Sequence, residues 1–142
     1  DVIVGFPMET EEDFQASYDF VESIHFYETH IFKYSRRHGT KAAAMSGQLT
    51  EAQKAVRSDK MLALNEQHAK EYEKSMLGNE LKVLLEEEVE INGEQWYIGH
   101  SMEYIKTAVK KQDNYGVNDI VTVKAEEFLE EHTLTGKVLG VE

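Results

Sequence analysis

The first ten residues constrain the fold more than any other segment of the chain. Residues 2–4 (Val-Ile-Val) form a short continuous apolar run, which is typical of a parallel strand covered on both faces. Gly5 and Pro7 end this run, and Thr10 follows as a good helix N-cap. A buried strand needs neighbouring strands and helices. We therefore expect residue 1 to lie inside a larger α/β fold, of which this chain is a fragment.

Composition and charge exclude several classes of protein. Of the 142 residues, 30% are charged and 41% hydrophobic, which is typical of a soluble globular protein. No apolar run has the length of a membrane span and no signal peptide is visible, so we expect a cytoplasmic protein with no membrane partner. The absence of cysteine excludes disulfides, a thiol nucleophile and cysteine-ligated clusters within these residues.

The net charge of −12 is distributed unevenly along the chain. Residues 1–75 carry 9 basic and 13 acidic groups, a net charge of −4, and residues 76–142 carry 6 basic and 14 acidic groups, a net charge of −8. Non-specific nucleic-acid binding needs clustered Lys and Arg. Any RNA site must therefore be a local basic patch.

The first half of the sequence predicts alternating strands and helices. Thr10 with Asp13 forms a capping box, and the helix it opens is expected to end near His25. Residues 29–34 predict a second strand and residues 35–48 a loop. Thr50 with Gln53 forms a second capping box, which opens a helix over residues 51–75. Part of the buried face of this helix is predicted at Ala55, Leu62, Ala69 and Met76.

The second half of the sequence predicts an all-β unit. Alternating apolar residues from Val83 to Ile91 indicate a half-buried strand, and Asn92-Gly93 is a strong signal for a type I′ hairpin. Further strands are predicted at Trp96 to Ile98 and over residues 104–109, 120–123 and 134–139. Five short strands in this space favour a small closed barrel. Gly78-Asn79 is a plausible domain junction, so we predict domains 1–76 and 77–142.

The order of these elements resembles one enzyme family. Val2-x-Val4-Gly5-Phe6-Pro7-x-Glu9-Thr10 followed by Glu-Glu-Asp-Phe is similar to the strand-and-turn motif of radical S-adenosylmethionine (SAM) methylthiotransferases, with Met8 in place of the usual second Gly. The segment from His30 to Met45, the Lys54-Ala55-Val56-Arg57 helix and a final barrel resemble the next parts of the same family. The segments Tyr104-Ile105 and Asp119 to Val123 are most similar to the members acting on threonylcarbamoyl-adenosine.

This resemblance implies a fold and a function. The fold class would be an α/β fragment, the end of a partial TIM-like radical-SAM barrel, followed by a small five-stranded OB-like barrel called TRAM. The full-length enzyme would use SAM and two [4Fe–4S] clusters to add a methylthio group to a modified adenosine beside the tRNA anticodon, or to a ribosomal protein. The cluster cysteines would lie upstream, in the missing N-terminal domains. The fragment alone is therefore expected to hold no cluster and to be inactive.

The predicted SAM-contacting residues follow the two strands. Gly5 lets the main chain approach a ligand, and a turn that needs Gly and Pro only for its geometry is the alternative. Glu9 is expected to hold backbone groups rather than to act as a base. Phe32 is a candidate for stacking near the adenine or, equally, a core residue. The complete predicted set is Gly5, Phe6, Pro7, Glu9, Thr10, Phe32, Tyr34 and Ser35.

The predicted RNA-contacting residues are basic and aromatic. Arg36, Arg37 and Lys41 form the clearest basic cluster, which suits an RNA phosphate or the SAM carboxylate, and a solvated loop is the alternative. Basic side chains interleaved with aromatic ones are typical of single-strand binding, and a lysine-protected edge strand is the alternative. In the barrel these are Tyr104, Lys106, Lys110 and Lys111, beside Tyr115.

Other features of the sequence carry less information about function. The acidic run Glu86-Glu87-Glu88 with Glu90 is expected to face away from RNA, and the six histidines show no metal-ligand spacing, so no metal ligand is predicted. An RNA-binding module without a catalytic domain and a radical-SAM enzyme with another substrate remain as alternative functions. Because a partial barrel exposes strand edges and apolar faces, residues 1–49 are also predicted to associate with another copy or to pack abnormally.

Overall fold

The computed structural model describes residues 1–142, which form two compact units, Asp1–Glu71 and Tyr72–Glu142. The predicted domains 1–76 and 77–142 stay a prediction. No helix of the structure is both long and apolar enough to cross a membrane.

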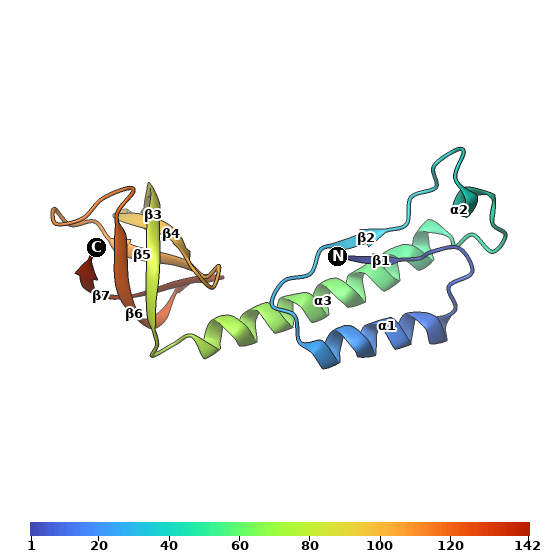
Figure 1. The fold of residues 1–142 in the computed structure, drawn as a ribbon, viewed down its shortest axis with the longest axis horizontal. Helices are drawn as coiled ribbons and strands as arrows, with labels where there is room; N and C mark the ends of the chain where they lie inside the picture. The colour runs from blue at the N-terminus through green and yellow to red at the C-terminus, as the bar shows by residue number, and fades with distance from the viewer. The chain divides into compact units, whose positions relative to one another are not determined.

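The first unit is built on a two-stranded parallel sheet. Strands β1 (Val2–Val4) and β2 (Ile31–Lys33) pair with Ile3 opposite Phe32. Helices α1 (Glu11–Ile24) and α3 (Glu51–Ser75) lie side by side against one face of this sheet (Figure 1). The second predicted strand is therefore confirmed, although it is shorter than residues 29–34. The predicted loop 35–48 contains a short helix, α2 (Lys41–Ala44).

Both capping boxes form as predicted. The Thr10 N–H donates to the Asp13 carboxylate over 3.0 Å, and the Asp13 N–H donates to the Thr10 hydroxyl over 3.1 Å. Thr50 and Gln53 make the same reciprocal pair at the start of α3. Helix α1 ends where expected, because its C-cap His25 takes the left-handed conformation with φ of 60°.

The predicted buried face of α3 is wrong at Leu62, and Ala55, Ala69 and Met76 are only half-buried. Leu62 is 47% exposed, whereas its neighbour Met61 is 1% exposed. A seven-residue spacing drifts around a helix of 3.6 residues per turn, so no straight stripe follows it. Within the first unit, the buried residues of α3 are apolar, polar and charged: Lys54, Arg57, Ser58, Met61, Leu64 and His68.

The core of the first unit lies on only one face of its sheet. Val4 packs with Phe14 and Val21 of α1 and with Met61 and Leu64 of α3. The other face carries two exposed apolar side chains, Ile3 at 58% and Phe32 at 53%. Within these 142 residues Phe32 is therefore not a core residue. This bare face is where the first unit has room for a ligand or for further chain.

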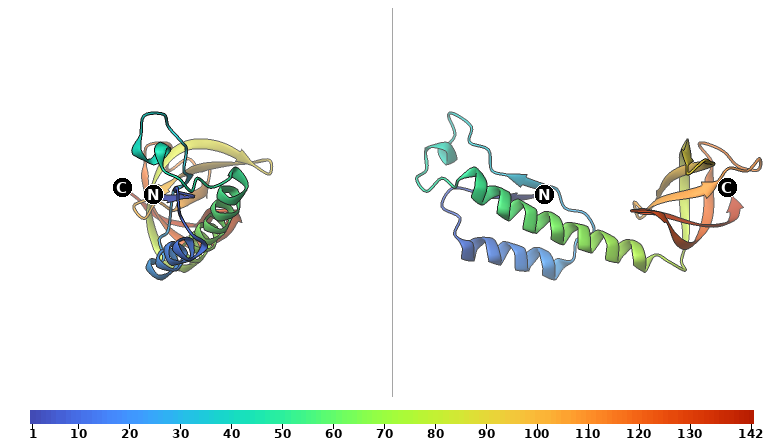
Figure 2. Two further views of the ribbon diagram at one scale, coloured as in Figure 1. Left: turned by 90° about the vertical axis from the view of Figure 1, so that its right-hand side faces the viewer. Right: turned by 180° about the vertical axis from the view of Figure 1, so that it is seen from behind.

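The second unit is a closed barrel of five strands, as the sequence predicts. Its strands are β3 (Glu80–Ile91), β4 (Glu94–Ser101), β5 (Lys106–Lys110), β6 (Ile120–Glu130) and β7 (Thr133–Val141), in the closed order β3-β4-β5-β7-β6. Figure 2 shows the barrel in two further views, in yellow to red. The β3–β4 turn has positive φ at both Asn92 (51°) and Gly93 (80°), as the predicted type I′ hairpin requires. Tyr104, which was predicted in a strand, lies before β5 in a turn.

Two bent strands close the barrel at glycines. The β3–β4 register shifts between Leu85 and Glu87, opposite Gly99, and β6–β7 has an equivalent shift opposite Gly136. A Cβ added at Gly99 would lie only 1.7 Å from the Leu84 carbonyl oxygen. Bulges of this kind bend strands at barrel corners, and here the close backbone approach excludes any side chain.

The Asp13 carboxylate makes the stability of the first unit dependent on pH. The hydrogen bond from the Thr10 main chain, followed by that with its side chain, holds the pKa of Asp13 below its ordinary value of 3.8. The stabilising contribution is therefore complete above that ordinary value and is lost as the pH falls through the lower folded value. We expect Asp13→Asn to lower the Tm at neutral pH and the difference from wild type to shrink toward about pH 2.

The matched control is Glu12→Gln, which removes an acidic group from the same helical turn. It should change the Tm less than Asp13→Asn, because it removes only the favourable charge–dipole interaction. Equal Tm losses for both variants, measured by circular dichroism, would contradict this role of Asp13.

Candidate functional site

A hollow of about 450 Å³ lies on the bare face of the β1–β2 sheet. Ile3 and Phe32 form its apolar floor, and Tyr34, Ser35 and Arg37 continue its wall along the chain after β2. The complete lining is Ile3, Phe32, Lys33, Tyr34, Ser35, Arg37, Thr40 and Ala42. The hollow thus joins an apolar, half-aromatic floor to a guanidinium, a combination suited to a flat ring with a charged tail.

A strained turn follows β1. The Glu9 N–H donates to the Phe6 carbonyl over 3.0 Å, with Pro7 and Met8 between them. Met8 has φ of 69°, the value that a type II turn requires at its third residue and that normally selects Gly. The Met8 N–H donates to the Gly47 carbonyl over 2.8 Å, so the loop before α3 holds this turn in place.

Gly5 is required at its position for two reasons. Its φ of 76° lies in the left-handed region, and a Cβ added to it would lie 2.5 Å from Cγ of Lys54. The main chain of β1 therefore runs directly against the aliphatic stem of a buried lysine on α3. From the sequence, Gly5 was predicted to let the main chain approach a ligand. In the structure, the group that lies closest to the position of a Gly5 Cβ is the Lys54 side chain.

Glu9 holds main chain, the role expected from the sequence. One carboxylate oxygen accepts the Gly5 N–H over 3.1 Å and a guanidinium N–H of Arg57 over 2.6 Å. Arg57 also donates to the Glu9 carbonyl over 3.0 Å. Thr10 is occupied as the N-cap of α1. The side chains of Glu9 and Thr10 thus bond to groups of the protein itself and fix the shape of the loop.

Phe6 and Tyr34 connect the two strand ends. Their rings meet edge to face, with centroids 5.4 Å apart and planes at 68°. The Tyr34 N–H donates to the Val4 carbonyl, and its own carbonyl accepts the Lys54 ammonium over 3.1 Å. The wall of the hollow is therefore tied to the β1–β2 sheet on one side and to α3 on the other.

The structure divides the predicted basic cluster. Arg36 donates from Nε to the Ala43 carbonyl over 3.0 Å and so ties α2 to its own loop. Arg37 lines the hollow. Lys41 is exposed on α2 and does not line the hollow. Of the three, only Arg37 is placed to meet a ligand that lies against Ile3 and Phe32.

The barrel residues predicted to bind RNA also fall into two groups. Tyr104 and Lys106 lie at the start of β5, whereas Lys110 and Lys111 lie at and after its end, about 13 Å along the strand. Lys111 contacts Glu88 over 2.7 Å and Lys110 contacts Glu94 over 3.3 Å. These acidic partners reduce the positive charge that the second group offers to a phosphate.

Of the first group, Tyr104 borders a hollow of about 670 Å³ and Lys106 does not line it. Tyr104 is 76% exposed and Met102 is 81% exposed. Their turn is held rigidly, because the Tyr104 N–H donates to the Ser101 carbonyl and the Ile105 N–H donates to the Ser101 hydroxyl. The complete lining is Lys82, Leu84, Glu86, His100, Ser101, Met102, Tyr104, Ile120 and Glu142.

Two neighbours of the predicted RNA site differ from expectation. Tyr115 is 6% exposed, and its hydroxyl donates to the Lys110 carbonyl, so it is part of the barrel core and offers no stacking surface. Burial raises the pKa of this hydroxyl. Glu86 of the acidic run lies in the hollow beside Tyr104, where it contacts His100 over 2.9 Å. The acidic run is therefore not confined to another face.

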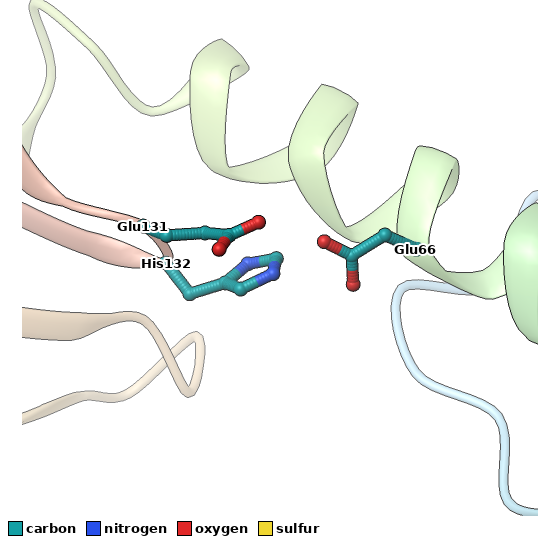
Figure 3. Close-up of side chains that lie close together, drawn as sticks. All are labelled: Glu66, Glu131 and His132. Carbon is teal, nitrogen blue, oxygen red and sulfur yellow. The ribbon is translucent and has the colours of Figure 1, made fainter.

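A buried carboxylate in the second unit was not predicted. His132, labelled with Glu131 at the β6–β7 turn in Figure 3, places Nδ1 2.8 Å from the carboxylate of Glu73. Glu73 is 4% exposed. The two residues are 59 positions apart, so no local pattern in the sequence indicates the pair.

Comparison with known proteins gives a consistent result. No protein-family model matches the chain. The chain is 41% identical over 126 residues, or 87% of its length, to threonylcarbamoyladenosine tRNA methylthiotransferase MtaB of Bacillus subtilis, and it covers 28% of that protein. The chain belongs to the methylthiotransferase family. The family expected from the sequence motifs is therefore confirmed.

Two other methylthiotransferase relatives have different named substrates. The chain is 37% identical over 96% of its length to ribosomal protein uS12 methylthiotransferase RimO of Clostridium perfringens, covering 31% of that protein. It is 46% identical over 61% of its length to tRNA-2-methylthio-N(6)-dimethylallyladenosine synthase of a Jannaschia species, covering 19% of it. The chain thus spans less than a third of the length of these relatives.

Gly5 and Gly39 provide a matched test of the loop geometry. Both have positive φ, but a Cβ at Gly39 meets nothing within 4 Å. We expect Gly39→Ala to lower the free energy of unfolding by about 1 kcal/mol and Gly5→Ala to lower it by about 3 kcal/mol, because the second also adds overpacking. Urea denaturation monitored by circular dichroism measures both. Equal losses would show that Lys54 does not restrict Gly5.

Proposed function

We propose that this chain is the C-terminal part of a radical-SAM methylthiotransferase, in which its first unit contributes to the SAM site and its second unit, an OB-like TRAM barrel, contacts the substrate. The observation that carries the proposal is the hollow over Ile3 and Phe32 on the bare face of two parallel strands, which continues along Tyr34 and Ser35 past the carboxyl end of β2. The motif that resembles the family's SAM-binding turn does not line this hollow, but its Phe6 contacts Tyr34 in the wall. Ligands of α/β folds commonly bind at the carboxyl ends of parallel strands.

The residues present fit SAM but not the iron–sulfur clusters. The apolar floor suits the adenine, Tyr34 and Ser35 border it, and Arg37 suits the carboxylate. With no cysteine in the chain, the clusters would be held by other parts of the enzyme. Bound SAM supplies the radical and methyl chemistry of the reaction. The role of this chain is to bind and orient it and to exclude water from one side.

A ligand-binding measurement tests the SAM assignment. In the longer enzyme that carries this chain, loaded with its clusters, we expect Phe32→Ala to weaken binding of S-adenosylhomocysteine about tenfold, because the adenine loses its apolar floor. Lys41→Ala is the control, since Lys41 does not line the hollow. Isothermal titration calorimetry measures both. Unchanged affinity in Phe32→Ala would place the SAM site elsewhere.

For the second unit we propose that RNA contacts the Tyr104 side of the barrel, with the anticodon arm of a tRNA as the substrate. Support comes from the exposed Tyr104, from Lys106 opposite His100 of the hollow, and from the tRNA named for the Bacillus relative. Lys82 of the hollow is already paired with Glu142 over 2.8 Å. A single-stranded loop presents unstacked bases, which aromatic side chains recognise by stacking. The net charge of the second half requires such a local site rather than a broad basic surface.

Titration of this chain with an anticodon stem-loop tests the RNA contact. We expect Tyr104→Ala to weaken binding about tenfold through lost stacking, and Lys106→Ala to reduce the salt slope by about 1. Lys111→Ala is the control, since Glu88 already partners that ammonium. Equal effects of Lys106→Ala and Lys111→Ala would contradict the assignment. Absence of RNA binding alongside binding of uS12 would favour the substrate named for the Clostridium relative.

A further inference from the structure

We propose that Arg57 and Lys54, two buried cations on α3, are positioning residues that hold the loop after β1 and the chain after β2 in the shape that binds a ligand in the Ile3–Phe32 hollow. The two side chains lie three residues apart on one face of α3 and are 8% and 5% exposed. The identity of the ligand as SAM rests on the proposed function. The holding role itself rests on the contacts described next.

Arg57 fixes the loop after β1 through Glu9. Its guanidinium donates a hydrogen bond of 2.6 Å to the Glu9 carboxylate and one of 3.0 Å to the Glu9 carbonyl. The same carboxylate oxygen accepts the Gly5 N–H. Three charge-assisted bonds therefore set where the loop begins and ends. Glu11 adds a longer contact of 3.4 Å to the other guanidinium nitrogen.

Lys54 fixes the chain after β2. Its ammonium donates to the Tyr34 carbonyl over 3.1 Å and contacts Glu51 over 3.2 Å. Its aliphatic stem packs against Gly5, so one side chain contacts the ends of both strands. Tyr34 is part of the wall of the hollow. Movement of this ammonium would therefore change the wall directly.

Stability alone does not account for two buried cations at this place. Burying a charge carries a desolvation cost, and apolar residues of similar volume often serve equally well in a core. The gain here is geometric, because both cations bind main-chain carbonyl groups of segments that have little regular structure. The core beside them is already supplied by Val4, Phe14 and Met61.

Hydrogen exchange of this chain tests the holding role without any ligand. We expect Arg57→Met to speed amide exchange in residues 5–10 about tenfold, and Lys54→Met, which keeps the stem beside Gly5, to do the same at residues 34–36. Exchange in the middle of α1 should stay unchanged. Lys60→Met is the control, since this α3 lysine is 53% exposed and its one ion pair, 3.8 Å to the exposed Glu11 of α1, lies outside both segments. Uniform acceleration, or none, would overturn the proposal.

A double variant separates positioning from stability. Arg57→Met leaves the Glu9 carboxylate unpaired, whereas Glu9→Gln with Arg57→Met removes both charges and should recover most of the lost Tm. In the longer enzyme, we expect this double variant to bind S-adenosylhomocysteine about tenfold more weakly than wild type despite its recovered Tm. Affinity that recovers together with Tm would show a purely structural role. If the loops loosen as expected but the wild-type enzyme does not bind S-adenosylhomocysteine, the SAM assignment fails and the holding role stands.

Discussion

The ion pair between Arg57 and Glu9 is the interaction on which the first unit's site depends. It connects the second turn of the protein's longest helix to a turn that the chain would not adopt easily, since Met8, which is not a glycine, has positive φ. Local backbone strain persists only where surrounding structure holds it. Here the holding groups are a buried guanidinium and, beside it, the Lys54 ammonium. The bare face of the sheet then becomes a defined hollow rather than a flexible edge.

The two units differ in how completely their sheets are paired and covered. The barrel pairs every strand and bends β3 and β6 at bulges opposite Gly99 and Gly136. The first unit covers one face of a two-stranded sheet and leaves the other apolar and exposed. A small ligand fills only part of such a face. This asymmetry agrees with a chain that spans less than a third of its methylthiotransferase relatives.

Local signals in the sequence predicted the elements well, and distant contacts decided the rest. The capping boxes of Thr10 and Thr50 and the turn at Asn92 each follow from residues close together in the chain. The five short strands were also readable locally, although their closure into a barrel depends on distant pairs such as Glu80 with Lys124. The predicted buried face of α3 was wrong at Leu62 and left out Lys54 and Arg57, because partners as far as 48 positions away bury these two cations. The different roles of Arg36 and Arg37 could not be predicted from the sequence either. Only the fold shows that Arg37 lines the hollow while Arg36 binds its own loop.

The central claim is that SAM lies on the floor formed by Ile3 and Phe32. A crystal structure of the longer enzyme with S-adenosylhomocysteine tests it most directly. The account predicts the adenine in van der Waals contact with both side chains and the ligand carboxylate within reach of Arg37. An adenine bound elsewhere, with other chain segments packed over Ile3 and Phe32, would contradict it and would make this face a part of the protein core.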